Sequence, residues 1–219
     1  HVIGKYKAKT VTSSNGDIWT GYDGMICRYD EKGDSLLLYT EEDIPDISSL
    51  LVSGNKIWVG TYEGLYVIEK GEKARCLVDG PEFYRLFESS SGEVWAGCRT
   101  GGLYRIMPDE KVVWYSDSNA EPFHIESNQI RSFAEDRFGN IWFGTFLGLH
   151  KYNPYTDKFT VYRQDHLPGS LSHSSVFSVY IDAQATIWVG TYYGGANYFN
   201  PEKEIFAHYT DNPFRKECL

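Results

Sequence analysis

The stretch Asn-Ile-Trp-Phe-Gly-Thr-Phe-Leu-Gly-Leu, residues 140–149, decides the fold, because the chain of 219 residues writes this phrase five times. The other copies begin at residues 17, 56, 93 and 186, and in each a tryptophan is followed two residues later by a glycine. The five tryptophans, Trp19, Trp58, Trp95, Trp142 and Trp188, lie 39, 37, 47 and 46 residues apart. A period of this size indicates stacked supersecondary units that share a continuous core.

Each repeat divides into four short strands. The first strands, alternating or β-branched, are expected at 6–13, 48–53, 83–89, 130–136 and 176–182. A turn with Gly, Asn or Asp then leads into the Trp phrase, except in the fifth repeat, where Ala183-Gln184-Ala185 must turn without glycine. The third strands are expected to end near Tyr29, Ile68, Ile106, Tyr152 and Phe199, and the fourth to cover 35–39, 74–78, 112–115, 159–162 and 205–209.

Four antiparallel strands with two apolar faces, repeated five times, predict an all-β fold, a β-propeller of five four-stranded blades. The expected blades are 1–43, 44–80, 81–126, 127–172 and 173–219, in one domain. In the second strand the Trp side chain faces away from its Ile and Val neighbours, so we expect the five tryptophans to pack between blades. The glycine after each Trp is expected to allow the close approach of a neighbouring backbone or an unusual local geometry. Trp114 lies off this pattern and is expected at an outer edge.

Each repeat is complete from its first to its fourth strand, so no strand remains to close a ring within one blade. An open arc of five blades would expose the apolar faces of the first and the fifth, and exposed patches of that size usually find partners. We therefore expect this chain to be part of a larger propeller, and to self-associate or to be only marginally stable when isolated. A closed five-bladed ring is the alternative.

The composition excludes some functions. A net charge of −9 with no Lys/Arg run opposes binding to a phosphate backbone, so nucleic acid is not an expected partner. No apolar run approaches the roughly 18 residues of a membrane span, and the sequence starts at His1, so any targeting or anchoring segment is expected outside it. The four cysteines, Cys27, Cys76, Cys98 and Cys218, share no close spacing, do not form a disulfide framework and leave the redox compartment open.

Propeller topology selects candidate binding residues, because the hairpins between second and third strands open on the same face as the loops between blades. The candidate ligand-binding residues on this face are Tyr22, Asp23, Tyr62, Glu63, Arg99, Arg131, Phe146, Tyr192 and Tyr193, next to Thr100 and the interblade loops 119–128 and 164–174. Aromatic rings cover the apolar C–H face of a sugar, and planar polar groups bind its hydroxyls or acidic substituents. Arg99 and Arg131 are the side chains that would meet a carboxylate or sulfate. Alternatively, the tyrosines only shield neighbouring strands.

An enzyme would need a positioned constellation. The chain has no His-Glu-x-x-His, no Gly-x-Ser-x-Gly and no glycine-rich phosphate loop. His124-x-Glu126 lacks the Pro-Cys-x-x-Cys that a zinc deaminase requires. We predict no catalytic residue, metal or cofactor. A lyase or glycosidase site assembled from distant side chains remains an alternative, as does a protein-binding scaffold.

The Trp phrase, the preceding strand that ends in Asp, and the Phe-x-x-Tyr strands at 159–162 and 206–209 resemble the two-component regulator propeller repeat. Residues 194–201, Gly-Gly-Ala-Asn-Tyr-Phe-Asn-Pro, are similar to late repeats in the periplasmic sensor half of hybrid two-component receptors from gut Bacteroidetes. The resemblance covers essentially the whole chain, although streptogramin-lyase-like propellers use similar blades.

This resemblance implies blades of a seven-bladed propeller in the periplasmic, ligand-sensing part of an inner-membrane receptor. It implies an oligosaccharide as ligand and a signal relayed to a histidine kinase outside this chain. The implied partners are the remaining blades, the downstream signalling domains and, in one arrangement, a second copy in a homodimer.

Overall fold

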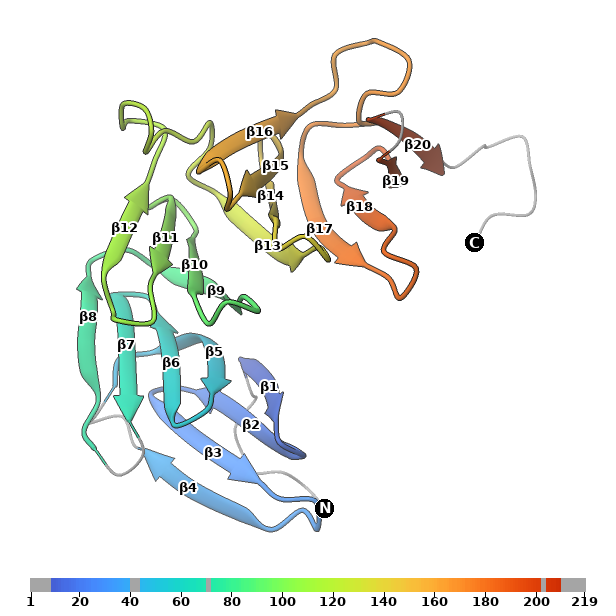
Figure 1. Cartoon of the computed structure of the whole chain (residues 1–219). Coiled ribbons are helices and arrows are strands. Elements are labelled where there is room, and N and C mark those ends of the chain that lie inside the picture. Colours follow the sequence, from blue (N-terminus) through green and yellow to red (C-terminus); the bar gives the residue numbers. More distant parts are fainter. Residues whose placement is uncertain (1–8, 40–43, 70–71, 202–203, 210–219) are drawn as a thin grey trace. The chain divides into compact units, whose positions relative to one another are not determined.

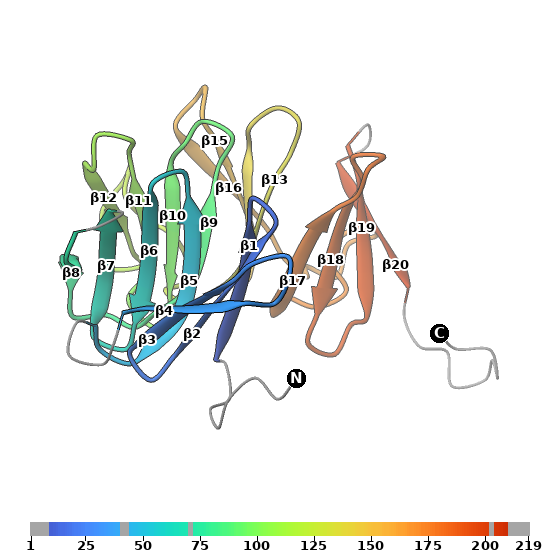
Figure 2. The ribbon, with the colours of Figure 1, turned by 90° about the horizontal axis from the view of Figure 1, so that it is seen from below.

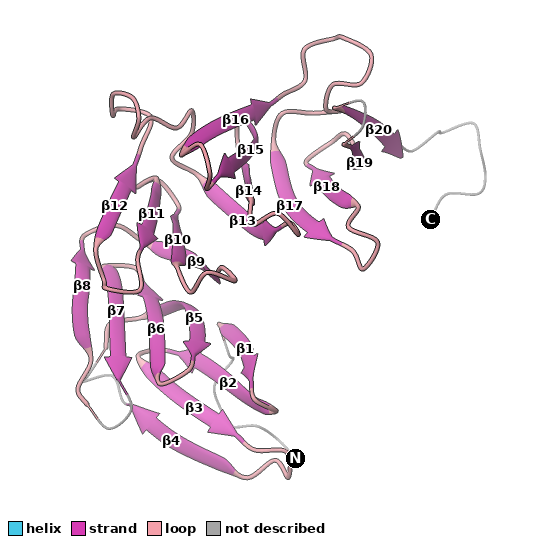
Figure 3. Cartoon of the chain, viewed as in Figure 1, coloured by secondary structure: helices cyan, strands magenta, loops and turns pink. Residues whose placement is uncertain are grey.

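The computed structural model describes residues 9–39, 44–69, 72–201 and 204–209, which form twenty strands and no helix (Figure 3). The start of the predicted strand 6–13 and Cys218 lie outside these residues. The chain separates into two compact units, residues 1–88 with 92–114 and residues 89–91 with 115–219. Because the described part contains only strands and loops, it offers no helix of the length and apolarity that a membrane crossing needs.

The first unit contains three four-stranded antiparallel sheets, and their first strands β1, β5 and β9 lie next to one another (Figure 1). The strands are β1 (Thr10–Ser14), β2 (Asp17–Tyr22), β3 (Met25–Tyr29), β4 (Ser35–Tyr39), β5 (Ile47–Ser53), β6 (Lys56–Thr61), β7 (Gly64–Glu69), β8 (Arg75–Asp79), β9 (Phe83–Glu88), β10 (Val94–Cys98), β11 (Leu103–Ile106) and β12 (Val112–Tyr115).

The second unit contains two more such sheets, with β13 beside β17 (Figure 2). Its strands are β13 (Ile130–Glu135), β14 (Ile141–Thr145), β15 (Gly148–Asn153), β16 (Lys158–Tyr162), β17 (Val176–Ile181), β18 (Ile187–Thr191), β19 (Ala196–Asn200) and β20 (Ile205–Tyr209). In all five sheets, strands that are consecutive in sequence are neighbours in space. The predicted fold class, five four-stranded antiparallel blades of an all-β propeller, is confirmed.

The core lies between successive sheets. The face of β5–β8 that carries Trp58 and Val67 packs against Val94 and Ala96 of the next sheet. In the second unit, Trp142 packs in the same way against the next sheet, in a cluster with Ile187, Val189 and Phe199. The Trp face of one blade therefore receives the Ile/Val face of the following blade. Trp58, Trp95 and Trp142 are 0–5% exposed, whereas Trp19 and Trp188 are only partly buried.

In the second blade, the glycine after Trp allows the close approach of a neighbouring backbone, as predicted. A Cβ added to Gly60 would overlap the backbone oxygen of Phe83, in the first strand of the next sheet. Ser48 also donates a hydrogen bond of 2.5 Å to that oxygen. The two blades thus approach backbone to backbone at this point.

The turn before the Trp phrase shows how the fifth repeat manages without glycine. Gly139 has a φ of 77°, in the left-handed region, and Ala185 takes the same role with a φ of 63°. Both turns are held by an aspartate at the end of the preceding strand. Asp182 accepts hydrogen bonds from the backbone of Gln184 and Thr186 and from Trp188 Nε1, and these bonds lower the pKa of its carboxyl, the Trp188 bond most of all.

The structure also places Trp114 and three cysteines. Trp114 lies in the edge strand β12, is 45% exposed, and donates a hydrogen bond of 2.8 Å to the oxygen of Gly101. Among the described cysteines, Cys27, Cys76 and Cys98 are free thiols.

Candidate functional site

In four of the five blades, a β-bulge at the start of the first strand places one side chain on the predicted binding face. In β13 the pairing skips from Ile130↔Thr145 to Ser132↔Gly144, and in β17 from Val176↔Thr191 to Ser178↔Gly190. The residues at these irregularities are Arg131 and Phe177, and their counterparts in β5 and β9 are Ser48 and Tyr84. A bulge bends its strand and re-aims a side chain, which is why bulges are common beside binding sites.

In the second unit these bulges build what we call the aromatic ladder: Phe146, Arg131, Phe177, Tyr192 and Tyr193. The Arg131 guanidinium lies 5.1 Å from the ring centroid of Phe146 and 4.3 Å from that of Phe177. Phe177 stacks on Tyr192 at 5.4 Å and 18°, and Tyr192 meets Tyr193 edge to face at 4.2 Å. The four rings are 48–81% exposed, so they form a continuous aromatic surface open to solvent.

The loop before β17 holds the ladder in place. Arg131 Nη1 donates a hydrogen bond of 2.9 Å to Ser175 Oγ, and the carbonyl of Ser175 accepts one of 2.9 Å from the backbone N–H of Tyr192. The Ser175 N–H in turn donates to His173 Nδ1 at 3.0 Å, and the His173 ring lies edge to face with Tyr193 at 6.2 Å. A hydrogen bond to Tyr192 raises the pKa of the Tyr193 hydroxyl, so this hydroxyl keeps its proton at pH 7.

In the first unit, Asp23 and Tyr62 share one lysine. Lys9 Nζ lies 3.0 Å from Asp23 Oδ1, 2.8 Å from Asp46 Oδ2 and 5.7 Å from the ring centroid of Tyr62. The bonds to Asp46 and then Asp23 raise the pKa of Lys9 above its ordinary value. Glu63 is placed in the β6–β7 hairpin, where its N–H donates to Thr61 Oγ1 at 3.1 Å.

The remaining predicted residues of the first unit make local contacts. Arg99 Nε donates a hydrogen bond of 2.8 Å to Glu82, and the Arg99 guanidinium lies 5.2 Å from the ring centroid of Tyr84. The charge of Arg99 is therefore already balanced by a carboxylate. Tyr22 directs its hydroxyl to Cys27 Sγ, 3.3 Å away in the adjacent strand.

Of the nine predicted residues, the structure brings Arg131, Phe146, Tyr192 and Tyr193 together. Phe177, which joins the two halves of the ladder, was not among them. The sequence does carry a usable signal for it, since Tyr84, Arg131 and Phe177 each lie eleven residues before the Trp of their own repeat, whereas Ser48 lies ten before Trp58. In a regular strand, a side chain at this position would project perpendicular to the sheet. The bulge instead turns it toward the face that carries the hairpins and the interblade loops.

The arrangement suits binding by stacking. Half-exposed rings with a cation between them offer apolar area and directional N–H donors at one place. Within the described residues, no group of three or more His, Cys, Asp or Glu side chains is positioned to hold a metal ion.

Residues 124–146, which include β13 and β14, match the family model of the two component regulator propeller. These residues are therefore similar to one unit of the two component regulator propeller. The other four blades of the chain repeat the same Trp phrase in the same strand.

One curated protein is similar in sequence, and two solved structures share this architecture. Histidine kinase P4 of Formosa agariphila is 31% identical over an alignment of 126 residues, which covers 51% of this chain and 9% of the kinase. The extracellular domain of a putative hybrid two component system from B. thetaiotaomicron superposes with a TM-score of 0.74 at 21% identity, over 95% of this chain and 29% of that one. Virginiamycin B lyase from Staphylococcus aureus superposes with a TM-score of 0.69 at 14% identity, over 96% of this chain and 72% of the lyase.

These likenesses establish the propeller fold. The chain spans 9% of its curated relative and 29% of the sensor ectodomain, so it corresponds to a small part of each.

Proposed function

We propose that this chain is a ligand-sensing segment of an extracytoplasmic propeller in a hybrid two-component receptor, and that it binds an oligosaccharide on the aromatic ladder. The observation that carries the proposal is the ladder itself, four half-exposed to exposed rings with Arg131 between two of them. The chain belongs, on this view, to a seven-bladed propeller in the periplasm, with blades bounded near residues 43, 80, 126 and 172.

The ladder is suited to a sugar for three reasons. Exposed rings cost free energy in water unless a ligand covers them, and the axial C–H faces of pyranoses are flat and apolar. Phe177 and Tyr192, stacked at 5.4 Å, extend the surface beyond the size of a single ring, which favours a ligand of more than one sugar unit. The Tyr192 and Tyr193 hydroxyls and the Arg131 N–H groups supply hydrogen bonds at its edge.

Sensing of this kind needs no catalytic residue. A ligand that binds one arrangement of the receptor more tightly than another shifts the population toward the first, and the kinase outside this chain responds to that shift. The partners in this proposal are the other blades and signalling domains of the parent protein, and a second receptor copy. The likeness to virginiamycin B lyase is one of fold, and an enzymatic role has no observation of its own in its favour.

The test is thermal unfolding of the chain against a panel of plant, fungal and host-derived oligosaccharides. A sugar present at 100 times its dissociation constant should add about 2.7 kcal/mol of stability, which is a readable shift. Phe177→Ala and Tyr193→Ala should each remove the shift while leaving the unliganded midpoint almost unchanged.

Tyr155→Ala is the matched control, because Tyr155 is 84% exposed and lies in the turn after β15, away from the ladder residues in sequence and strand position. A sugar response that survives in both ladder variants would contradict the proposed site. The absence of any response, both in this chain and in a longer chain containing all the blades, would contradict the sugar itself.

A further inference from the structure

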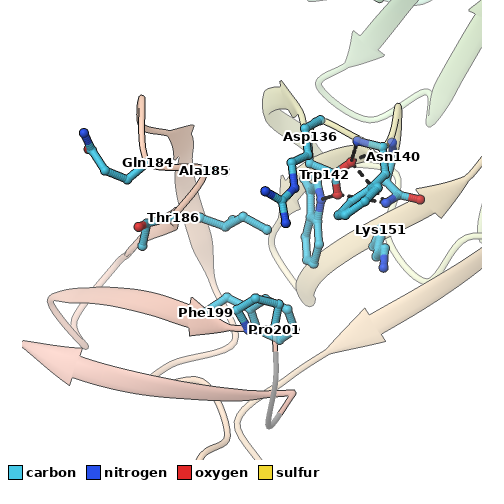
Figure 4. A pocket seen from close by; sticks show the side chains of 12 residues that line it. Asp136, Asn140, Trp142, Lys151, Gln184, Ala185, Thr186, Phe199 and Pro201 are labelled. Atoms are coloured by element: carbon cyan, nitrogen blue, oxygen red, sulfur yellow. Dashed lines mark hydrogen bonds between the residues drawn. The ribbon is translucent and has the colours of Figure 1, made fainter.

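The second unit also contains a cavity, which lies at the opposite end of its strands from the aromatic ladder. It has a volume of about 420 Å³ and is lined by the β13–β14 turn, the β17–β18 turn and the end of β19 (Figure 4). We call it the basic pocket and define it by Arg137, Phe138, Trp142, Lys151 and Phe199. The ladder residues Arg131 and Phe177 stand at the starts of β13 and β17, about 20 Å away along six-residue strands.

The basic pocket has an apolar floor and an aromatic rim. Trp142, Ile187 and Phe199 are 1–6% exposed and form the floor, where the Trp142 ring lies 5.5 Å from that of Phe199. At the rim, Phe138 is 59% exposed and Pro201 is exposed. This volume and lining fall within the range typical of small-molecule sites.

The acidic side chain of this pocket is already used within the fold. Asp136 Oδ1 accepts hydrogen bonds from the N–H groups of Phe138 and Asn140 at 2.9 and 3.0 Å. Asp136 Oδ2 accepts from Trp142 Nε1 and from Asn140 Nδ2, both at 2.8 Å (Figure 4). Four donors saturate the carboxylate, so it serves to hold the turn.

The two cations of the pocket, by contrast, rest on rings. The Arg137 guanidinium lies 4.9 Å from the ring centroid of Phe138, and Lys151 Nζ lies 5.3 Å from that of Trp142. Within the part of the chain that the structure describes, neither cation forms an ion pair. In a chain with a net charge of −9, two cations beside one apolar cavity, neither paired with a carboxylate of the described residues, form a local exception.

We propose that the basic pocket binds a carboxylate carried on a six-membered ring. The ring lies against Phe138 and Pro201, and the carboxylate accepts charge-assisted hydrogen bonds from Arg137 and Lys151. The ring of such a ligand is either aromatic, as in a hydroxybenzoate, or a sugar, as in a uronate. This site is independent of the function proposed for the aromatic ladder.

The test is calorimetric titration of the 219-residue chain with 4-hydroxybenzoate and with glucuronate at low salt. The matched neutral ligands are 4-hydroxybenzamide and glucose, which keep the ring and lose the charge. We expect at least one acid to bind and its neutral counterpart not to bind. Arg137→Gln and Lys151→Gln should each weaken binding about tenfold or more, and raising the salt tenfold should weaken it further.

Two control variants distinguish the basic pocket from a general charge effect and from the aromatic ladder. Lys158→Gln removes an exposed cation of the same sheet outside the pocket, and Tyr193→Ala removes a ladder ring; neither should change the affinity for the acid. Unchanged thermal midpoints will show that the Gln variants are folded. The proposal is overturned if neither acid binds, or if an acid binds the Gln variants as tightly as the wild type.

Discussion

His150 shows how a single residue ties the stability of a blade to pH. Its side chain is 0% exposed in β15 and stacks on Phe143 at 4.9 Å and 18°. Burial lowers the pKa of this imidazole to about 4, with a smaller contribution in the same direction from His124, while the carbonyl of Gly148 opposes the shift. The folded chain therefore keeps His150 neutral under conditions in which an unfolded chain would protonate it.

The sign of the pH dependence follows. Between pH 6.5 and pH 4 the unfolded chain binds a proton that the folded chain does not, so stability falls as the pH is lowered through this window. His150 alone should account for roughly 3 kcal/mol of loss between pH 7 and pH 4. Urea unfolding at the two pH values measures it. The control is His150→Asn, because the fifth sheet has an asparagine, Asn197, at the equivalent position of β19. Between pH 7 and pH 4, this variant should lose about 3 kcal/mol less unfolding free energy than the wild type. Equal losses in both proteins would show that the proton binds elsewhere.

At the scale of the element, the packing of one blade on the next can be measured with two tryptophans. Trp142 and Trp188 occupy the same strand position, and each donates its Nε1–H to an aspartate six residues earlier at 2.8 Å. Trp142 is 1% exposed beneath the following blade, whereas Trp188 contacts the rings of Tyr198 and Tyr209 in its own sheet and is only partly buried. The hydrogen bond is thus common to both, and the interblade contact differs.

Trp142→Ala should therefore destabilise the chain by roughly 3–5 kcal/mol, through loss of burial and the cavity left between blades. Trp188→Ala, which loses the same hydrogen bond but opens no enclosed cavity, should cost roughly 2 kcal/mol less. Chemical denaturation of the two variants beside the wild type gives both values. Identical midpoints for wild type and Trp142→Ala would place the core elsewhere.

The strands were predictable from the sequence because Trp142 and its four equivalents mark one fixed position per blade, and alternation then assigns the faces. The sequence predicts a turn without glycine in the fifth repeat, but not which residue takes the left-handed conformation. In the structure this residue is Ala185, with a φ of 63°. Phe177 was not predicted: its distance from Trp188 matches that of Arg131 from Trp142, but a bulge sets the direction of its side chain and depends on the hydrogen-bond register between two strands. The basic pocket needed the structure as well, because Arg137 and Lys151 are 14 residues apart and meet only through the fold of one sheet.

At the scale of the whole molecule, the first and the last sheet each have one apolar face that no described strand of the same unit covers. In the sheet β1–β4, Val11, Ile18 and Leu37 are 50–62% exposed, although the positions equivalent to Ile18 in the second, third and fifth sheets are 3–7% exposed. In the sheet β17–β20 the Trp188 face is open, with Tyr180 at 65% and Tyr209 at 55%. Inside each unit a Trp face always receives an Ile/Val face, so these two open faces are of complementary types.

Complementary faces on one chain predict head-to-tail association of copies, which continues beyond a dimer unless it closes. Light scattering should give a mass that rises with concentration. Ile18→Lys and Tyr180→Lys should each lower that mass, because every contact uses one face of each type. Tyr155→Lys, at an exposed turn on neither face, should leave the mass unchanged.

A dimer formed by two Trp faces would respond to Tyr180→Lys alone. A monomer of constant mass at all concentrations would show that the open faces do not attract one another. The same two faces would be covered by further blades in a longer parent chain, so there the Lys substitutions should lower the unfolding midpoint instead of the mass.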